Sequence, residues 1–180
     1  MGRLGPVLEQ IYSYLVAAHK KTRAEFLLSN PEPVFVVEPF IQDDRAKFHT
    51  TAGAGAPGTT HSIARVRKRE GANAFGIMVT IGRAKNNDIE LLAPDVSKFH
   101  AYLMQGPDGS WSITDAGSTY GTQVAGRRLQ PKTDRVQLKV GDKVSVGSVA
   151  MTFLGPSEFY DYLKNPDRTR EREVTPPELR

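Results

Sequence analysis

The chain has 180 residues, of which 39% are hydrophobic and 24% charged, with no cysteine and a formal net charge of +4. This size allows one domain with flanking extensions, and the lack of cysteine excludes disulfides and thiolate zinc sites. No apolar run reaches the roughly 18 residues of a membrane span, and no secretory signal opens the chain. We therefore expect a soluble, cytoplasmic protein with no membrane partner.

Residues 1–30 predict an N-terminal amphipathic helix. Its apolar positions follow spacings of three and four and share one helical stripe; they are Leu4, Leu8, Ile11, Leu15 and Ala18. Pro6 suits a first helical turn, and Asn30-Pro31 is typical of a helix end. The stripe either docks on the rest of the chain or serves partner binding, including self-association through this helix.

A short apolar run, Val34–Val37, predicts the first strand of a sandwich that we place at residues 31–154. Residues 42–61 predict a flexible loop. Within it, Gly53–Gly58 matches the dinucleotide pattern G-x-G-x-x-G, but polar residues precede it and a strand follows. The strand before and the helix after that this motif requires are missing, which favours a linker of small residues.

A basic run beside the next strand raises the question of nucleic-acid binding. Alternation puts Arg65, Arg67 and Arg69 on one strand face, with Lys68 between them and little aromatic interleaving for base stacking. This pattern favours a solvated strand face over a nucleic-acid interface. Residues 62–154 nevertheless hold 13 Lys and Arg against 8 Asp and Glu, so we expect anionic partners.

The following strands are short and are separated by turn residues. Residues 77–81 alternate, with Ile77, Val79 and Ile81 on one expected buried face. Further strands are expected at 111–113, 121–124, 144–146 and 149–153, with Gly126 and Gly147-Ser148 in tight turns. About ten such strands predict an antiparallel sandwich.

The C-terminal part predicts a short helix at residues 155–164, capped by Ser157, with Phe159, Tyr160 and Leu163 facing the fold. Residues 165–180 are polar and mixed in charge, which is typical of a disordered tail. The tail holds Thr169 and Thr175, which are candidate phosphothreonines for a binding site on the same or a neighbouring molecule.

Between residues 62 and 154, short motifs follow in a set order. They are Gly82-Arg83, Asn87-Asp88-Ile89, Ser97-x-x-His100, Asp115-x-x-Ser118-Thr119-x-Gly121-Thr122, Gly126, Leu138 with Gly141-Asp142, and Val146-Gly147. Each is weak alone, but together they resemble the forkhead-associated (FHA) domain. The resemblance covers about half of the chain. It implies an all-β fold, an antiparallel two-sheet FHA-type β-sandwich, here with an N-terminal helix and a short C-terminal helix.

The resemblance also implies a phosphothreonine site on the loops. The family's phosphate-binding Arg and Ser map onto Arg83 and Ser97, with Thr119 beside them and Lys98 as a further cation or backbone donor. A phosphate carries a charge near −2 and three acceptor oxygens, which a fixed cation and directed donors can satisfy. In structural roles, His100 braces the Ser97 loop and Ser118, Gly82 and Gly121 complete the motifs.

Two positions depart from the family pattern. Tyr120 stands where the family has an Asn that contacts the peptide main chain, and a phenol cannot replace the paired donor and acceptor of an amide. Tyr120 is therefore the candidate peptide contact at this position. Lys98 replaces an Arg, which keeps the charge and loses the guanidinium fork.

The sequence offers no catalytic set. Ser97 and His100 share a loop without an acid partner or a G-x-S-x-G elbow, and the four histidines have no metal-ligand spacing. We expect a non-enzymatic module without cofactor or metal, which binds a phosphorylated protein such as a Ser/Thr kinase or its substrate. The alternative hypothesis is an FHA sandwich with a degenerate pocket that acts in phosphate-independent assembly or dimerisation.

Overall fold

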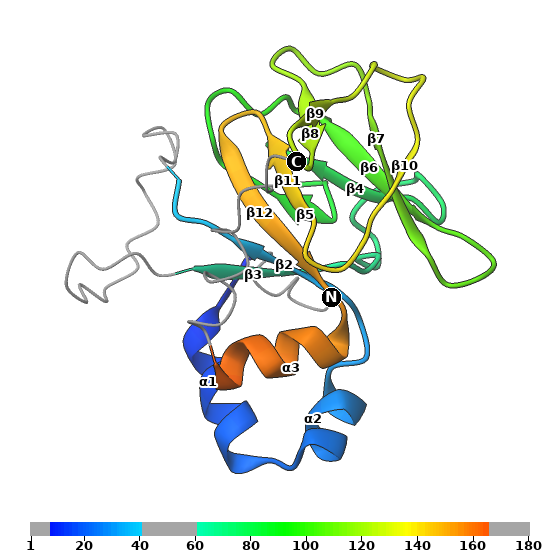
Figure 1. The fold of residues 1–180 in the computed structure, drawn as a ribbon. Helices are drawn as coiled ribbons and strands as arrows, with labels where there is room; N and C mark the ends of the chain where they lie inside the picture. Colours follow the sequence, from blue (N-terminus) through cyan, green and yellow to red (C-terminus); the bar gives the residue numbers. More distant parts are fainter. Residues whose placement is uncertain (1–7, 41–60, 166–180) are drawn as a thin grey trace, which may run out of the picture.

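The computed structural model describes residues 8–40 and 61–165. Its strands form two sheets that face each other, with three helices at one end (Figure 1). The first sheet has the order β1 (Glu9–Gln10), β3 (Ser62–Arg65), β2 (Val34–Val37), β12 (Val149–Leu154), β11 (Lys143–Val146), β8 (Thr122–Val124), β9 (Arg127–Arg128). The second has the order β10 (Val136–Gln137), β7 (Trp111–Asp115), β6 (Ala101–Gln105), β4 (Val79–Gly82), β5 (Ile89–Glu90).

The expected two-sheet sandwich is confirmed, with one exception to its antiparallel pairing. Strand β5 lies parallel to β4, with Ile89 opposite Ile81. The six residues between the two strands do not form a hairpin, because they bring the chain back so that β5 runs in the same direction as β4. Just after β5, the Leu91 N–H donates to the Gly82 carbonyl at 3.0 Å. The loop that carries Arg83 is consequently held against the sheet edge.

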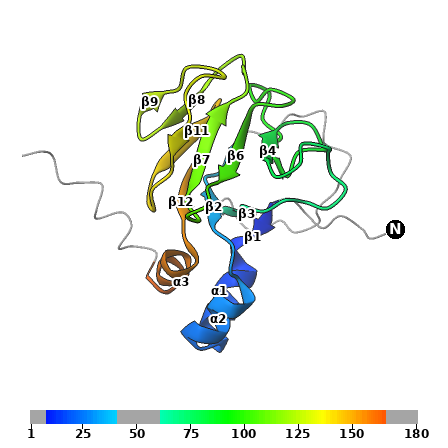
Figure 2. The ribbon, with the colours of Figure 1, turned by 90° about the vertical axis from the view of Figure 1, so that its right-hand side faces the viewer.

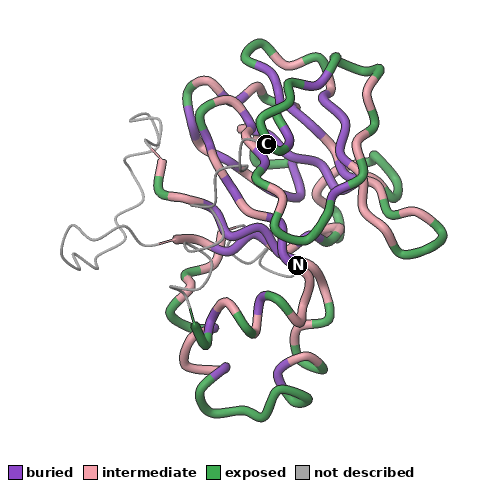
Figure 3. Tube along the Cα trace, viewed as in Figure 1, coloured by how far each residue is buried: buried purple, intermediate pink, exposed green. Residues whose placement is uncertain are grey.

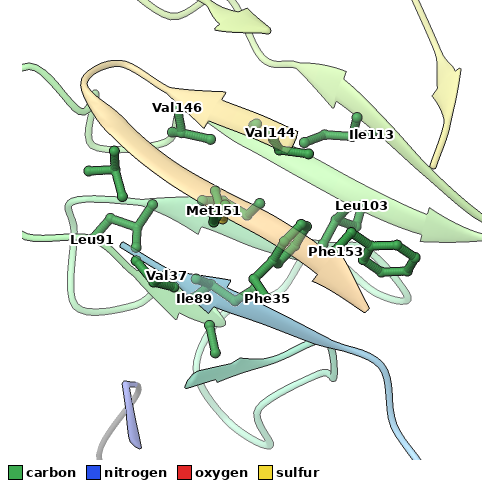
Figure 4. Packing of buried hydrophobic residues seen from close by; sticks show 14 of the residues in the cluster. Phe35, Val37, Ile89, Leu91, Leu103, Ile113, Val144, Val146, Met151 and Phe153 are labelled. Atoms are coloured by element: carbon green, nitrogen blue, oxygen red, sulfur yellow. The ribbon is translucent and has the colours of Figure 1, made fainter. Parts of the chain in front are cut away.

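The main core lies between the sheets, and both sheets contribute to it (Figures 3 and 4). Its buried members include Phe35, Val37, Ile81, Ile89, Leu91, Leu103, Ile113, Val144, Val146, Met151 and Phe153. Each such side chain contributes about 1.5–3 kcal/mol on burial. This packing gives the loops at the sheet ends a rigid base.

The helices α1 (Ile11–Lys20), α2 (Arg23–Ser29) and α3 (Pro156–Lys164) form a second core on the outer face of β2, β3 and β12. Phe159 is fully buried there, with the ring centroids of Tyr14 and Phe26 at 5.1 and 6.0 Å. Both views put these helices at the end opposite to β8 and β9 (Figures 1 and 2). The described part of the N-terminal apolar stripe, from Leu8 to Ala18, therefore docks on its own fold.

Two helix predictions were wrong in detail. The single helix expected within residues 1–30 is two helices, α1 and α2, because Thr22 caps α2 through a reciprocal capping box with Glu25. The segment before α1 is strand β1, which pairs with β3. In the C-terminal helix, Gly155 and not Ser157 is the N-cap, and Pro156 takes the first position.

The strand predicted at residues 77–81 is shifted. Strand β4 begins at Val79, and Ile77 is 74% exposed, so it does not share the buried face of Val79 and Ile81. Thr80, expected on the solvent side, is fully buried, because its N–H and hydroxyl both bind Asp88. The alternation was misleading because a loop covers the outer side of this strand.

The basic run is a solvated face only at Arg67, whose side chain is 52% exposed. Strand β3 ends at Arg65, whose side chain donates to the Tyr14 hydroxyl at 2.8 Å and pairs with Glu9 at 3.1 Å. Lys68 pairs with the buried Asp88 at 3.0 Å, and the Arg69 guanidinium donates to the Asn87 carbonyl. These cations mostly serve internal contacts.

Several predictions fall outside the described residues. They concern the start of the N-terminal helix with Leu4 and Pro6, nearly all of the 42–61 loop with Gly53–Gly58, and the tail with Thr169 and Thr175. In the parts of the chain that are described, none of the helices is long and apolar enough to cross a membrane.

Candidate functional site

Three loops meet at one end of the strands of the five-stranded sheet, because of the register of β4, β6 and β7. Ile81, Ala101 and Asp115 lie opposite one another on β4, β6 and β7. Since β6 is antiparallel to both neighbours, the chain leaving β4, the chain entering β6 and the chain leaving β7 lie at the same end. These are the loops that carry Arg83, Ser97 and Thr119.

Arg83 is bound to the Ser97 loop through its backbone and its side chain. Its N–H donates to the Ser97 carbonyl at 2.9 Å, and its Nε donates to the Val96 carbonyl at 3.0 Å. The residue is half-buried. The guanidinium is therefore a cation with a set position beside Ser97, which is what recognition of an oxyanion requires.

Ser97 joins the second loop to the third. Its Oγ accepts the Thr119 N–H at 3.1 Å, and the side chains of Thr119 and Lys98 are exposed at this edge. No described residue accepts a hydrogen bond from the Ser97 hydroxyl, so its hydrogen is available to an acceptor from solution. The structure thus brings Arg83, Ser97 and Thr119 together, with Lys98 next to Ser97 on the outside.

His100 connects the Ser97 loop to the Gly121 backbone from inside the protein. Its Nδ1 accepts the Ser97 N–H at 3.0 Å, so the ring proton is on Nε2, which donates to the Gly121 carbonyl at 3.1 Å. The ring is fully buried. Burial lowers the pKa of His100 below its ordinary 6.5, although the Gly121 carbonyl and Asp115 oppose the shift.

We expect the free energy of unfolding to fall as the pH is lowered from about 6.5. In that range the unfolded chain takes up a proton at this position, whereas the folded ring stays neutral until its lower pKa is passed. The stability contributed by the neutral ring is complete above pH 6.5 and is lost as the pH falls through the pKa of the folded state. At that point a proton on Nδ1 replaces the acceptor for the Ser97 N–H. An NMR titration of the His100 ring measures this pKa, and a value at or above 6.5 would contradict the expectation.

Asp115 is the hub of the third loop. One carboxylate oxygen accepts the N–H groups of Gly117 and Ser118, both at 2.8 Å. The other accepts the hydroxyls of Ser118 at 2.6 Å and Thr122 at 2.7 Å. Burial alone would raise the pKa of Asp115, but these hydrogen bonds outweigh it and hold the pKa below the ordinary 3.8.

Gly82 has a role that differs from the expected backbone turn. It is the last residue of β4, and a Cβ there would lie 2.4 Å from the Lys98 carbonyl oxygen and 2.9 Å from Asn87 Nδ2. Real Cβ atoms do not approach so closely, so glycine is needed for the two loops to touch. Gly121, in contrast, does have the expected left-handed backbone, with φ +86°.

Two side chains that the sequence placed only within motifs hold the site together. Asn87 is buried and donates from Nδ2 to the carbonyls of Ala84 at 2.8 Å and Lys98 at 2.6 Å, which ties the Arg83 loop to the Ser97 loop. Asp115 holds the third loop internally, through its bonds to Gly117, Ser118 and Thr122. An Asp followed by small residues often binds the backbone of the turn that follows it. This pattern in the sequence could have predicted the role of Asp115.

Tyr120 lies outside this network. Its side chain is 60% exposed, and no hydrogen bond of its hydroxyl is found among the described residues. Ser118, its neighbour but one, instead turns inward, and its Oγ accepts the Gly121 N–H at 2.9 Å. A phenol thus stands at the rim of the site, beside Thr119. In the described ranges 8–40 and 61–165, no group of three or more acidic or histidine side chains is placed to hold a metal ion.

Comparison with known proteins identifies the segment that holds all of these residues. Residues 79–147 match the family model of the FHA domain. This segment is an FHA domain. It runs from β4 to the end of β11, so the resemblance in the sequence motifs is confirmed over this range.

Among curated proteins, human Kanadaptin is 33% identical over 111 residues, which is 55% of this chain and 14% of that protein. The chain therefore spans a small part of the curated relatives that it matches. Among solved structures, EmbR of Mycobacterium tuberculosis, in complex with a low-affinity phosphopeptide, is 29% identical over 43% of this chain and 20% of that one, with a TM-score of 0.39. An FHA domain of an Arabidopsis thaliana hypothetical protein is 18% identical, covers 69% of this chain and 85% of that one, and has a TM-score of 0.47.

Proposed function

We propose that this FHA domain binds a phosphothreonine-containing segment of another protein, and that it acts by binding and not by catalysis. FHA homologues bind phosphothreonine peptides in general. The observation that carries the proposal for this chain is the junction at Ser97. Its hydroxyl accepts from Thr119, and the loop on which it sits anchors Arg83.

The three groups match the needs of a phosphate monoester. Arg83 supplies a fixed positive charge, the Ser97 hydroxyl has a hydrogen to donate, and Thr119 offers an exposed hydroxyl on a braced loop. Charge-assisted hydrogen bonds of this kind contribute about 1.5–3 kcal/mol each. Lys98 adds an exposed charge at the rim, which attracts an anion but offers no guanidinium fork to orient it.

The proposed partner is a Ser/Thr kinase or a kinase substrate, since both carry phosphothreonine. The protein would then work in signal transduction, in the cytoplasm. The helices contribute nothing to the phosphate site in this proposal, because they lie at the opposite end of the sandwich from β8 and β9 (Figure 2).

A second candidate function is favoured by Tyr120. An exposed phenol in place of the family's Asn removes a contact to the peptide main chain. In that case the sandwich would act as a phosphate-independent assembly or dimerisation module. Self-association through the N-terminal helices would use side chains such as Tyr12 and Leu28, which are 70% and 83% exposed, because the main apolar stripe of α1 is already covered.

Calorimetric titration of the whole chain with a degenerate phosphothreonine peptide library tests the proposal. We expect binding of the phosphorylated pool and none of its unphosphorylated twin. Equal binding of both pools, or binding of neither, would contradict the proposed function and favour the assembly module. The mass of the chain in solution, measured by sedimentation, then checks whether it self-associates.

A further inference from the structure

Two cationic side chains lie directly against the loop that carries Thr119. The guanidinium of Arg128 covers Gly121, where a Cβ would lie 2.7 Å from its Nη2. The end of the Lys132 side chain covers Gly117, where a Cβ would lie 2.8 Å from its Cε and 3.4 Å from its Nζ. Both glycines lack a side chain, so each cation reaches the backbone on either side of Thr119.

Both cations start from well-defined backbone positions. Arg128 lies on β9, opposite Gln123 of β8. Lys132 has φ +62°, in the left-handed region that costs a residue with a side chain about 1–2 kcal/mol. Its N–H donates to the Asp115 carbonyl at 2.8 Å, which holds it in that conformation. The same Asp115 organises the Thr119 loop, so Lys132 and this loop share one anchor.

Three other cations of the fold have carboxylate partners. Arg65 pairs with Glu9, Lys68 with Asp88, and Arg127 with Asp134 at 2.9 Å. In the described part of the chain, neither Arg128 nor Lys132 has a carboxylate oxygen within 4.0 Å. Their charges are uncompensated at the place where an anionic ligand is expected.

We propose that Arg128 and Lys132 form a second anion-binding subsite, which takes a carboxylate or phosphate from a residue close to the phosphothreonine in the same segment. The inference rests on the proposed function and names the class of partner: phosphothreonine with a further acidic or phosphorylated neighbour. Gly117 and Gly121 are each two residues from Thr119. At about 3.3–3.6 Å per extended residue, an anionic side chain within about three positions of the phosphothreonine reaches the subsite.

The size of the effect follows from exposure. Both side chains are exposed, so each contact to an anionic group is screened by salt and is modest. For the pair we expect a peptide with one added glutamate to bind about fivefold more tightly than its glutamine twin at low salt. The preference should shrink as the salt concentration rises.

The test uses the whole chain and matched phosphothreonine peptides that carry Glu, phosphoserine or Gln at each of three positions on either side. The double variant Arg128→Gln/Lys132→Gln is compared with the wild type and with Arg127→Gln. Arg127 is the control because it lies on the same strand and is already paired with Asp134. The Glu and phosphoserine arms distinguish a carboxylate from a phosphate ligand.

We expect the wild type and Arg127→Gln to bind the anionic peptides more tightly than the Gln peptides. The double variant should bind the Glu and phosphoserine peptides only as tightly as the matched Gln peptides. An anionic preference that survives in the double variant, or that is missing in the wild type, would overturn the subsite. If one of these two results is found and the wild type still binds the Gln phosphopeptides, the proposed function stands and only the subsite fails. If no phosphopeptide binds the wild type, both fail.

Discussion

Replacement of Arg83 by alanine should remove most of the affinity for a phosphothreonine peptide. The loss of one partner from a desolvated charge pair costs about 2–5 kcal/mol, which corresponds to a decrease in affinity of roughly 30-fold to several thousand-fold. Arg83→Lys should fall between, because it keeps the charge and loses both the fork and the Nε bond to Val96. Calorimetric titration with one phosphopeptide measures all three proteins.

The same substitution also removes a structural bond, so stability has to be measured in parallel. The Nε bond to the Val96 carbonyl contributes about 0.5–1.5 kcal/mol. A thermal melt separates this loss of stability from the loss of binding. Arg127→Ala is the control, because it removes an exposed cation that pairs with Asp134 and not with the Ser97 loop. An Arg83→Ala protein that keeps its melting temperature and binds within about threefold of the wild type would refute the phosphate role of Arg83.

Replacement of Asp115 by alanine should cost about 3–5 kcal/mol in the free energy of unfolding. The carboxylate is fully buried and accepts four hydrogen bonds, so its removal leaves several donors of one loop without an acceptor. Asp115→Asn should cost less, because the remaining oxygen still accepts the N–H groups of Gly117 and Ser118. Denaturation in urea measures the two losses.

Asp108→Ala is the matched control, because Asp108 is an exposed aspartate whose carboxylate binds only the nearby Ser110. We expect Asp108→Ala to lower the free energy of unfolding by well under half as much as Asp115→Ala. Asp115 variants that remain folded should also bind phosphopeptide more weakly, since the loop that holds Thr119 loses its anchor. An Asp115→Ala loss no larger than that of Asp108→Ala would show that the hydrogen-bond hub contributes little to stability.

The sequence by itself determined the features that depend on nearby residues. Val34–Val37 is a strand because an apolar run between prolines has no other good local structure, and Gly147 begins the hairpin turn because its φ of +58° suits glycine. The order of the Gly-Arg, Ser-x-x-His and Ser-Thr-x-Gly motifs was sufficient to predict the family. The break between α1 and α2 was also local, since Thr22 and Glu25 have the spacing of a capping box.

Only the tertiary structure decided what depends on contacts between distant residues. Thr80 is buried because a loop bound to Asp88 covers one side of β4, and Ile77 is exposed because it precedes that strand. No alternation rule can reveal either position. Gly82 is required by the approach of Lys98, a residue sixteen positions away in the printed sequence. The positions of Arg128 and Lys132 against the Thr119 loop likewise follow from strand pairing and from hydrogen bonds across loops, whose energy depends on geometry that sequence spacing does not contain.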